Sequence, residues 1–308
     1  MNVNRFTVVA IAGLLLAPSI AHSEEASKPS ARRGQTLRAA AVQMRSSRDL
    51  GENVARIKEH IRRCGEDGVR VVIFPECALS GYFVDLIPKL SAEQLADAER
   101  QVADACRESR IYAIVGTPHR SGESLFNSAV VIDPTGKVIE RYHKVQLAEA
   151  WPTPGDHLSV FKVDGVACSI IICHDERYPE LVRLPVLAGA RVVFYLSHES
   201  GVRQETKIGP YRAQIQARAM ENSVFIVHAN APANDDMSGS HGQSRTIAPD
   251  GNILHEASIF GEEVVISDLD LSRATGDLAR RSVSRGPLSQ WWEEGVKKVR
   301  VIESSDAP

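Results

Sequence analysis

Three side chains that could carry out nucleophilic chemistry each end an otherwise apolar run. Glu76 follows VVIFP, Lys144 follows VIERYH, and Cys173 follows CSIII. A charged group that is buried without a partner is costly, so such residues either face solvent or share a site. For any one of these residues taken alone, a side chain that faces solvent is the better interpretation. Because all three stand at equivalent ends of predicted strands, we expect one shared pocket.

These residue types permit acyl transfer. Cys173 as thiolate can attack a carbonyl carbon, and Glu76 can take the thiol proton, give it to the departing amine and later activate water. Lys144 and the backbone N–H after the cysteine can stabilise the oxyanion. The thioester is then hydrolysed. Because a carboxylate and an ammonium shift the pKa of a thiol in opposite directions, the sequence leaves both thiol and thiolate open for Cys173.

The segment 166–180, VACSIIICHDERYPE, is predicted to position the cysteine. Its apolar part indicates a buried strand, and Tyr178-Pro179-Glu180 indicates the start of a helix. Cys173 then lies at a strand-to-helix elbow, where unpaired N–H groups favour a thiolate or an oxyanion. A lone cysteine on an apolar strand is usually a structural one. The polar neighbours of Cys173 argue against that alternative here.

Predicted helices and strands alternate around this segment, and hairpins recur between them. We expect helices over 50–64, 91–110, 179–190 (interrupted at Pro185) and 211–222, and strands over 37–44, 69–74, 111–117, 127–133, 138–144, 158–163, 166–173, 191–196, 223–229, 243–248, 252–256 and 264–268. Ser91 and Gln94 form a capping-box signature. So many strands predict an α/β fold with two packed sheets, each covered by helices on one face.

Composition and cysteine usage exclude several classes. The 308 residues are 43% hydrophobic with a net charge of −3, so the chain can bury a large core and has no basic excess for nucleic acid. The five cysteines form no C-x-x-C pair and have no histidine at ligand spacing, so no metal site is expected. Three of them, Cys64, Cys106 and Cys168, are predicted to be small buried side chains.

The two ends of the chain differ from the middle. Residues 1–23 combine Arg5, an apolar stretch at 8–16 and small residues before Glu24, which predicts a signal peptide and a periplasmic or secreted protein. An uncleaved anchor is the alternative. A polar leader at 24–36, a catalytic domain at 37–273 and a C-terminal arm at 274–308 are expected to follow. The arm carries Trp291-Trp292 and is expected to pack on a neighbour or on its own surface.

The three chemical segments together resemble the nitrilase superfamily of carbon–nitrogen hydrolases. The similar motifs, which span Leu37 to Leu271, are FPE at 74–76, YHKVQL at 142–147, PGD at 154–156, CxDxRxPE at 173–180, Gly189-Ala190, RAMEN at 218–222, Ala229-Asn230, Gly242-Gln243-Ser244 and Pro249-Asp250-Gly251. The resemblance implies a four-layer αββα sandwich that forms a homo-dimer or a higher homo-oligomer.

The resemblance also implies roles for residues beside the three. Glu149 is similar to a second glutamate that orients the lysine, with a solvated loop carboxylate as the alternative. Asp175 and Arg177 match positions expected to lock the elbow through charge-assisted hydrogen bonds. His174 departs from the aromatic residue common after the cysteine. It either faces the substrate or is a structural histidine.

Four further side chains are candidates for the substrate pocket: Tyr82, His198, Glu199 and Tyr211. His198 and Glu199 follow a predicted strand end, although a surface loop is the simpler interpretation of each one alone. The Ser-His-Glu at 197–199 departs from the small or aromatic residues common in the family. We therefore expect an unusual substrate specificity.

The sequence favours an exported thiol amidohydrolase that cleaves a linear amide or N-carbamoyl group without a metal or organic cofactor. A nitrilase is one alternative, but nitrile-cleaving members typically carry Trp-Glu where this chain has His174-Asp175. An acyltransferase using the same thioester is another, although the chain lacks the multi-helix membrane portion of the lipoprotein-modifying branch. A non-enzymatic binding protein is disfavoured by the intact Glu76, Lys144 and Cys173.

Overall fold

The computed structural model describes residues 35–203, 208–284 and 299–302, which belong to one compact unit. The predicted signal peptide, the polar leader up to residue 34 and Trp291-Trp292 lie outside the described residues. The expectations for those segments therefore stay predictions.

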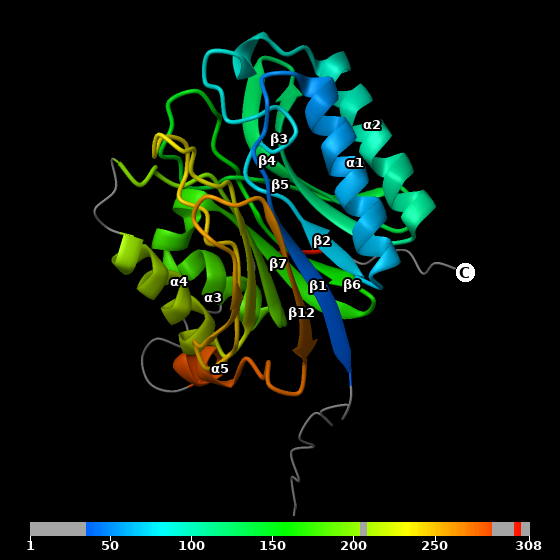
Figure 1. The fold of residues 1–308 in the computed structure, drawn as a ribbon. Coiled ribbons are helices and arrows are strands. Elements are labelled where there is room, and N and C mark those ends of the chain that lie inside the picture. The colour runs from blue at the N-terminus through cyan, green and yellow to red at the C-terminus, as the bar shows by residue number, and fades with distance from the viewer. Residues whose placement is uncertain (1–34, 204–207, 285–298, 303–308) are drawn as a thin grey trace, which may run out of the picture. The chain divides into compact units, whose positions relative to one another are not determined.

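The first sheet has six strands in the order β12-β1-β2-β3-β4-β5 (Figure 1). Their bounds are β12 Glu263–Asp270, β1 Thr36–Gln43, β2 Val71–Ile73, β3 Tyr112–Ser121, β4 Ser124–Ile132 and β5 Val138–His143. β1, β2 and β3 are parallel, as expected for strands joined through helices, and β3, β4 and β5 form an antiparallel meander. β5 is the edge strand that leads directly into Lys144.

Helices α1 (Leu50–Glu66) and α2 (Ala92–Ser109) lie side by side on the outer face of this sheet (Figure 1). α2 begins with the predicted capping box, because Ser91 accepts from the Gln94 N–H while the Gln94 side chain accepts from the Ser91 N–H. Apolar side chains at helical spacing, such as Ile57 and Ile61, pack onto the strands. This helical layer packs on the outer face of the sheet next to β2, the strand that leads to Glu76.

The second sheet has seven strands in the order β11-β10-β9-β8-β7-β6-β13. Their bounds are β11 Ile253–Glu256, β10 Arg245–Ile247, β9 Phe225–Asn230, β8 Val192–Ser197, β7 Val166–Ile172, β6 Leu158–Val163 and β13 Val299–Val301. β7, β8 and β9 are parallel, so their carboxyl ends lie at one edge of the sheet. Cys173 follows β7 and His198 follows β8 at that edge.

Helices α3 (Pro179–Leu187), α4 (Ile208–Asn222) and α5 (Asp277–Ser284) form the other helical layer. The expected interruption of α3 at Pro185 is wrong: the helix continues through it. Pro185 lies in the last turn, so only one hydrogen bond, to the Leu181 carbonyl, is lost. Burial of Val182 and Val186 against the sheet compensates for that loss.

The inner faces of the two sheets meet in a dry core. Ile114 and Ala129 of the first sheet belong to the same buried cluster as Ile171, Phe194 and Val227 of the second. The layer order is therefore αββα, which confirms the predicted fold. The described parts of the C-terminal arm pack on their own chain, α5 against α3 and α4, and β13 parallel to β6.

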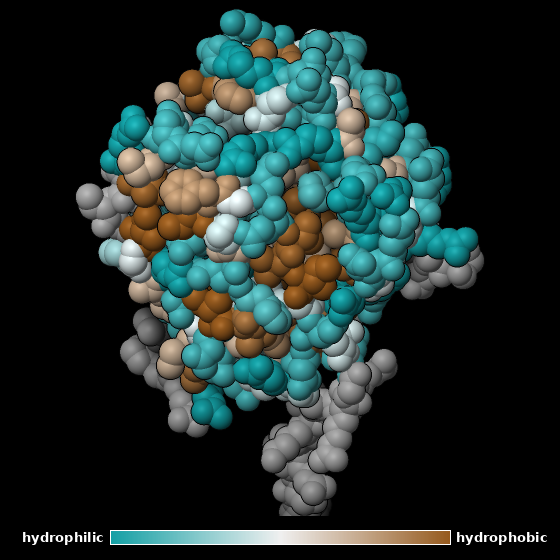
Figure 2. Space-filling view, viewed as in Figure 1, coloured by the Kyte–Doolittle hydropathy of each residue, from teal (hydrophilic) through white to brown (hydrophobic). Residues whose placement is uncertain are grey.

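The face in Figure 2 is mainly hydrophilic, with apolar areas between the polar side chains. Large exposed apolar side chains of the described residues include Met220, Phe260 and Leu278. Among the residues that the structure describes, no helix is long and apolar enough to cross a membrane. The predicted homo-oligomer stays a prediction.

Candidate active site

The structure buries Lys144 between two carboxylates. Its Nζ lies 2.8 Å from Glu76 Oε1 and 2.6 Å from Glu149 Oε1, and its side chain is only 1% exposed. Asn127 on β4, which was not predicted, donates its Nδ2–H to Glu76 Oε1 at 2.7 Å and to Glu149 Oε1 at 3.2 Å. Glu149 therefore holds the lysine, as the resemblance implied, and is not a solvated loop residue.

The pKa values of the two carboxylic acids are shifted in opposite directions. Burial raises the pKa of Glu149, but the charge and hydrogen bond of Lys144 outweigh burial and lower that pKa to about 2. Complete burial holds the pKa of Glu76 above its ordinary value in spite of Lys144. Burial alone would lower the pKa of Lys144, yet the nearby negative charges raise it. Glu149 thus balances the ammonium, while the pKa of Glu76 stays above its ordinary value.

Cys173 stands at the predicted elbow. β7 ends at Ile172, and a short 3-10 helix, η2 (Cys173–Arg177), follows at once. The backbone of Cys173 has φ of +42°, a left-handed conformation that is uncommon for a non-glycine residue. Such a conformation persists only where the surrounding structure holds it. The groups that fix the elbow are therefore part of the site.

Asp175 is one of these groups. Its carboxylate accepts hydrogen bonds from the Ile172 N–H at 3.0 Å, the Gln146 N–H at 2.7 Å and the Tyr142 hydroxyl at 2.8 Å. Burial raises the pKa of Asp175 to about 6, and these donors act in the opposite direction. Asp175 is thus a carboxylate at pH 7. It ties the elbow of the second sheet to the Lys144 segment of the first, as expected of a locking residue.

Arg177 makes a charge-assisted hydrogen bond on the other side of the elbow. Its guanidinium lies over the Tyr211 ring, 4.8 Å from the centroid, and donates to the Tyr211 hydroxyl. Tyr211 belongs to α4, so Arg177 fastens η2 to the outer helical layer.

The nucleophile rests as a thiol. Burial, followed by the charge of Glu76, raises the pKa of Cys173 well above its ordinary value, and Lys144 only partly opposes this. The side chain is nevertheless partly exposed to solvent. Cys173 therefore needs a base to become a nucleophile. Glu76 is the nearby carboxylate that is not already committed to balancing charge.

Cys173 opens into a cavity of about 480 Å³. Lys144 and Glu149 line it, and so do all the predicted substrate-pocket residues: Tyr82, His174, His198, Glu199 and Tyr211. The structure therefore brings together side chains from separate loops that the sequence could place only one by one. A neighbouring cavity of about 260 Å³ includes Glu76, and Tyr82 and His198 stand between the two.

Tyr82 and His198 form a stacked wall, with ring centroids 4.7 Å apart and planes 8° from parallel. The Tyr82 hydroxyl donates to Glu149 Oε1 at 2.7 Å. The backbone N–H of His198 donates to Glu76 Oε2 at 2.9 Å. Burial lowers the pKa of the His198 imidazole to about 4, so the ring is neutral at pH 7. The wall therefore positions both carboxylates as well as bounding the cavity.

Glu199 lines the cavity, yet both its oxygens have protein neighbours. Oε1 accepts from the Tyr195 hydroxyl at 2.7 Å, and Oε2 lies 2.6 Å from His241 Nε2. The arrangement favours a supporting role over direct substrate binding. Tyr195 and His241 were not predicted, nor were the buried His228 and Arg245 next to them. A single polar residue inside an apolar strand, as in FIVHAN, is the signal that could have found His228.

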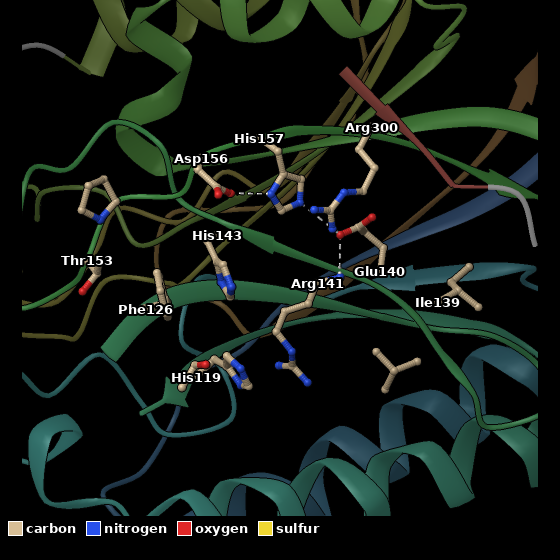
Figure 3. A pocket seen from close by; sticks show the side chains of 13 residues that line it. His119, Phe126, Ile139, Glu140, Arg141, His143, Thr153, Asp156, His157 and Arg300 are labelled. Atoms are coloured by element: carbon tan, nitrogen blue, oxygen red, sulfur yellow. Dashed lines mark hydrogen bonds and ion pairs between the residues drawn. The ribbon is translucent and has the colours of Figure 1, made fainter. Parts of the chain in front are cut away.

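A larger cavity of about 670 Å³ lies along the edge strand β5 (Figure 3). His157 is paired there with Asp156 at 2.9 Å, and His143 stacks on Phe126 with centroids 4.1 Å apart. Its described lining residues include no cysteine or lysine, so we assign the reaction to the smaller cavity at Cys173. No group of three His, Cys, Asp or Glu residues in the described part of the chain is arranged to hold a metal ion.

The sequence is similar to those of known proteins. A profile of the family described as carbon–nitrogen hydrolase matches residues 38–277. The chain is 27% identical to omega-amidase NIT2 of Homo sapiens over 280 residues, which cover 85% of this chain and 99% of that protein. It is 30% identical over 209 residues to a hydrolase in the agr operon of Staphylococcus lugdunensis, covering 65% and 88%.

Solved structures are similar too. An amidase of the nitrilase superfamily from Nesterenkonia AN1, solved as a cysteine-to-alanine mutant, has a TM-score of 0.73 at 25% identity, covering 83% of this chain and 97% of that one. Another structure of that amidase, with a TM-score of 0.71 at 25% identity and coverage of 81% and 97%, carries the acetamide moiety of fluoroacetamide on its active-site cysteine. The protein described here belongs to the carbon–nitrogen hydrolase family, within the nitrilase superfamily.

Proposed function

We propose that this protein is an exported amidase that hydrolyses a linear amide or N-carbamoyl C–N bond through a thioester on Cys173. The observation that carries the proposal is the buried Lys144, held by Glu76 and Glu149 beside the cavity into which Cys173 opens. The names of the relatives, omega-amidase and amidase, support an amide as the substrate.

The first half-reaction forms the thioester. Glu76 takes the proton of the Cys173 thiol as sulfur bonds to the carbonyl carbon, and the carbonyl oxygen becomes an oxyanion. The Lys144 ammonium and the His174 N–H stabilise that charge. When the C–N bond breaks, Glu76 returns its proton to the nitrogen, so a primary amide releases ammonia.

The second half-reaction consumes water. Glu76, again a carboxylate, takes a proton from water as the water oxygen attacks the thioester carbon. The C–S bond then breaks, the thiol regains its proton, and a carboxylic acid leaves. Glu76 and Lys144 thus act in both half-reactions, and each returns to its starting protonation state.

The test is a panel of short aliphatic, aromatic and N-carbamoyl amides, with ammonia and carboxylic acid measured in parallel. We expect equal amounts of the two products from at least one primary amide and none from the matching nitrile. The Cys173→Ser variant should remain folded and lose turnover, because a hydroxyl is a weaker nucleophile at this base. Full activity of that variant would overturn the assignment.

Export is the second part of the proposal, and it rests on the sequence of residues 1–23. In that location the enzyme would meet external amides rather than cytosolic ones. Scavenging of external amides is the role that this location favours.

A further inference from the structure

Tyr195 on β8 lies directly behind the nucleophile. Its hydroxyl is 3.3 Å from the carbonyl oxygen of Cys173, which is the carbonyl of the strained elbow. The ring is fully buried and stacks on His228, with centroids 4.2 Å apart and planes 19° from parallel. The position of the hydroxyl is therefore fixed by packing and does not depend on a substrate.

The contact between Tyr195 and the Cys173 carbonyl affects catalysis through the peptide bond between Cys173 and His174. The Cys173 carbonyl and the His174 N–H belong to one planar trans unit, so they point in opposite directions. A donor that holds the carbonyl toward Tyr195 therefore directs the His174 N–H away from Tyr195. That N–H is the backbone group expected to stabilise the oxyanion together with Lys144.

The elbow needs a hydrogen-bond donor at the Cys173 carbonyl because of its backbone conformation. Cys173 has φ of +42°, a backbone conformation that L-residues rarely adopt, so contacts with the surrounding structure must hold it. Asp175 accepts from the Ile172 N–H and so fixes the peptide between Ile171 and Ile172, one unit before the elbow. Tyr195 contacts the peptide that follows Cys173 through the Cys173 carbonyl.

Glu199 controls how the hydroxyl is used. Tyr195 has one proton, and the acceptors near it are Glu199 Oε1 at 2.7 Å, the Cys173 carbonyl at 3.3 Å and the Glu176 carboxyl. Because Glu199 is a closer acceptor than the Cys173 carbonyl and is itself held by His241 at 2.6 Å, it orients the hydroxyl and shares the proton with the peptide. This gives Glu199 a role at the site without contact to the substrate.

We propose that Tyr195 is a positioning residue that aims the oxyanion-stabilising N–H of His174, with Glu199 and His241 setting the direction of its hydroxyl. The inference rests on the proposed amide hydrolysis. Tyr195 exchanges no atom or proton with the substrate. Its effect should therefore appear wherever an oxyanion forms and nowhere else.

The test compares wild type with Tyr195→Phe, which keeps the ring and its stack on His228. We expect kcat for a primary amide to fall about tenfold with little change in KM, a smaller loss than removal of an oxyanion donor. Binding of an aliphatic aldehyde, which adds to the thiol and places a tetrahedral oxygen at the same N–H, should weaken in the same ratio. Alkylation of Cys173 by iodoacetamide, which forms no oxyanion, should be unchanged.

Tyr112→Phe is the matched control. It removes a hydroxyl from another largely buried tyrosine, one beside Asp164 at the end of the β6–β7 hairpin away from Cys173. We expect wild-type values in all three assays.

Two results would overturn the inference. One is wild-type kcat and aldehyde affinity in Tyr195→Phe. The other is a parallel loss of alkylation rate in that variant, which would indicate general disturbance of the elbow. If the wild-type protein turns over no amide in the panel, the proposed function fails as well. If the wild-type protein is active and Tyr195→Phe has the same kcat and aldehyde affinity, this inference alone is rejected.

Discussion

At the residue scale, the site separates two tasks that the sequence could not separate. Glu76 and Glu149 both contact Lys144, yet only Glu76 has a raised pKa. The difference comes from burial and from the hydrogen bonds of Glu149 to Tyr82 and Lys144, which depend on the loop after β2 meeting the loop after β5. The sequence identified the charged groups and their chemistry, while the directions of their pKa shifts required the structure.

Removal of the lysine should affect both stability and rate. In Lys144→Ala, two buried carboxylates lose the one cation that pairs with them among the described residues, and breaking a buried pair from one side costs about 3–5 kcal/mol. We expect the free energy of unfolding in urea to fall by about that amount, and kcat to fall at least 100-fold with the lost oxyanion contact. Wild-type kcat in a folded Lys144→Ala variant would show that the lysine plays no catalytic part.

The pH dependence should report Glu76. Only the carboxylate can accept the Cys173 proton, and burial raises the Glu76 pKa above the ordinary 4.5. Activity is therefore present above the raised pKa and is lost as the pH falls through it. Glu149, with a pKa of about 2, stays ionised over this range and cannot produce the loss.

The measurement is kcat/KM as a function of pH. We expect the acid limb at a pH clearly above 4.5. Lys144 should add no alkaline limb near neutrality, because its pKa is raised by its two carboxylates. An acid limb at or below the ordinary glutamate value would contradict the assignment of Glu76 as the base.

At the element scale, strand ends position the chemistry. The apolar runs before Glu76, Lys144 and Cys173 predicted the strands that end there, and the observed ends of β2, β5 and β7 agree within three residues. The supporting network was harder to predict. Tyr195, His228 and Arg245 are neighbours only because β8, β9 and β10 pair in one register, which no local pattern specifies.

One glycine sets the distance between β3 and the Glu76 segment. A Cβ on Gly116 would lie 2.2 Å from the Pro75 carbonyl oxygen and 2.8 Å from Glu76 Cα, so the backbone would have to move. We expect Gly116→Ala to destabilise the protein by about 1–3 kcal/mol and to lower kcat by displacing Glu76. Thermal or urea unfolding and steady-state kinetics measure the two effects.

Gly209 in α4 is the control, because a Cβ there meets nothing within 4 Å. Gly209→Ala should be neutral or stabilise by up to about 1 kcal/mol through helix propensity and the unfolded state. If Gly116→Ala behaves like this control, close packing of β3 does not position Glu76.

At the scale of the whole molecule, the αββα sandwich places Cys173 and Glu76 after strands of different sheets. Cys173 follows a strand of the second sheet, while Glu76 and Lys144 follow strands of the first. Asp175 bridges them through Gln146 and Tyr142. The two-sheet architecture was predictable from the alternation of strands and helices. The bridge was not, because it depends on how the sheets face each other.

Export should be visible in the mature chain. If residues 1–23 are a signal peptide, the protein expressed with its full leader should be recovered outside the cytoplasm with an intact mass that begins at Glu24. A variant with a charge placed in the apolar stretch, Leu14→Arg, should remain cytoplasmic at full length. Recovery of the unmodified full-length chain in the soluble cytoplasmic fraction would contradict export.

The central claim is that Cys173 carries an acyl group during turnover. Intact-protein mass spectrometry of wild type, quenched in acid during incubation with a hydrolysed amide, tests it directly. We predict an added mass equal to the acyl group, mapped by peptide analysis to Cys173, absent in Cys173→Ser and accompanied by ammonia release from wild type. Ammonia release with the adduct on another cysteine, or undiminished in Cys173→Ser, would contradict the account.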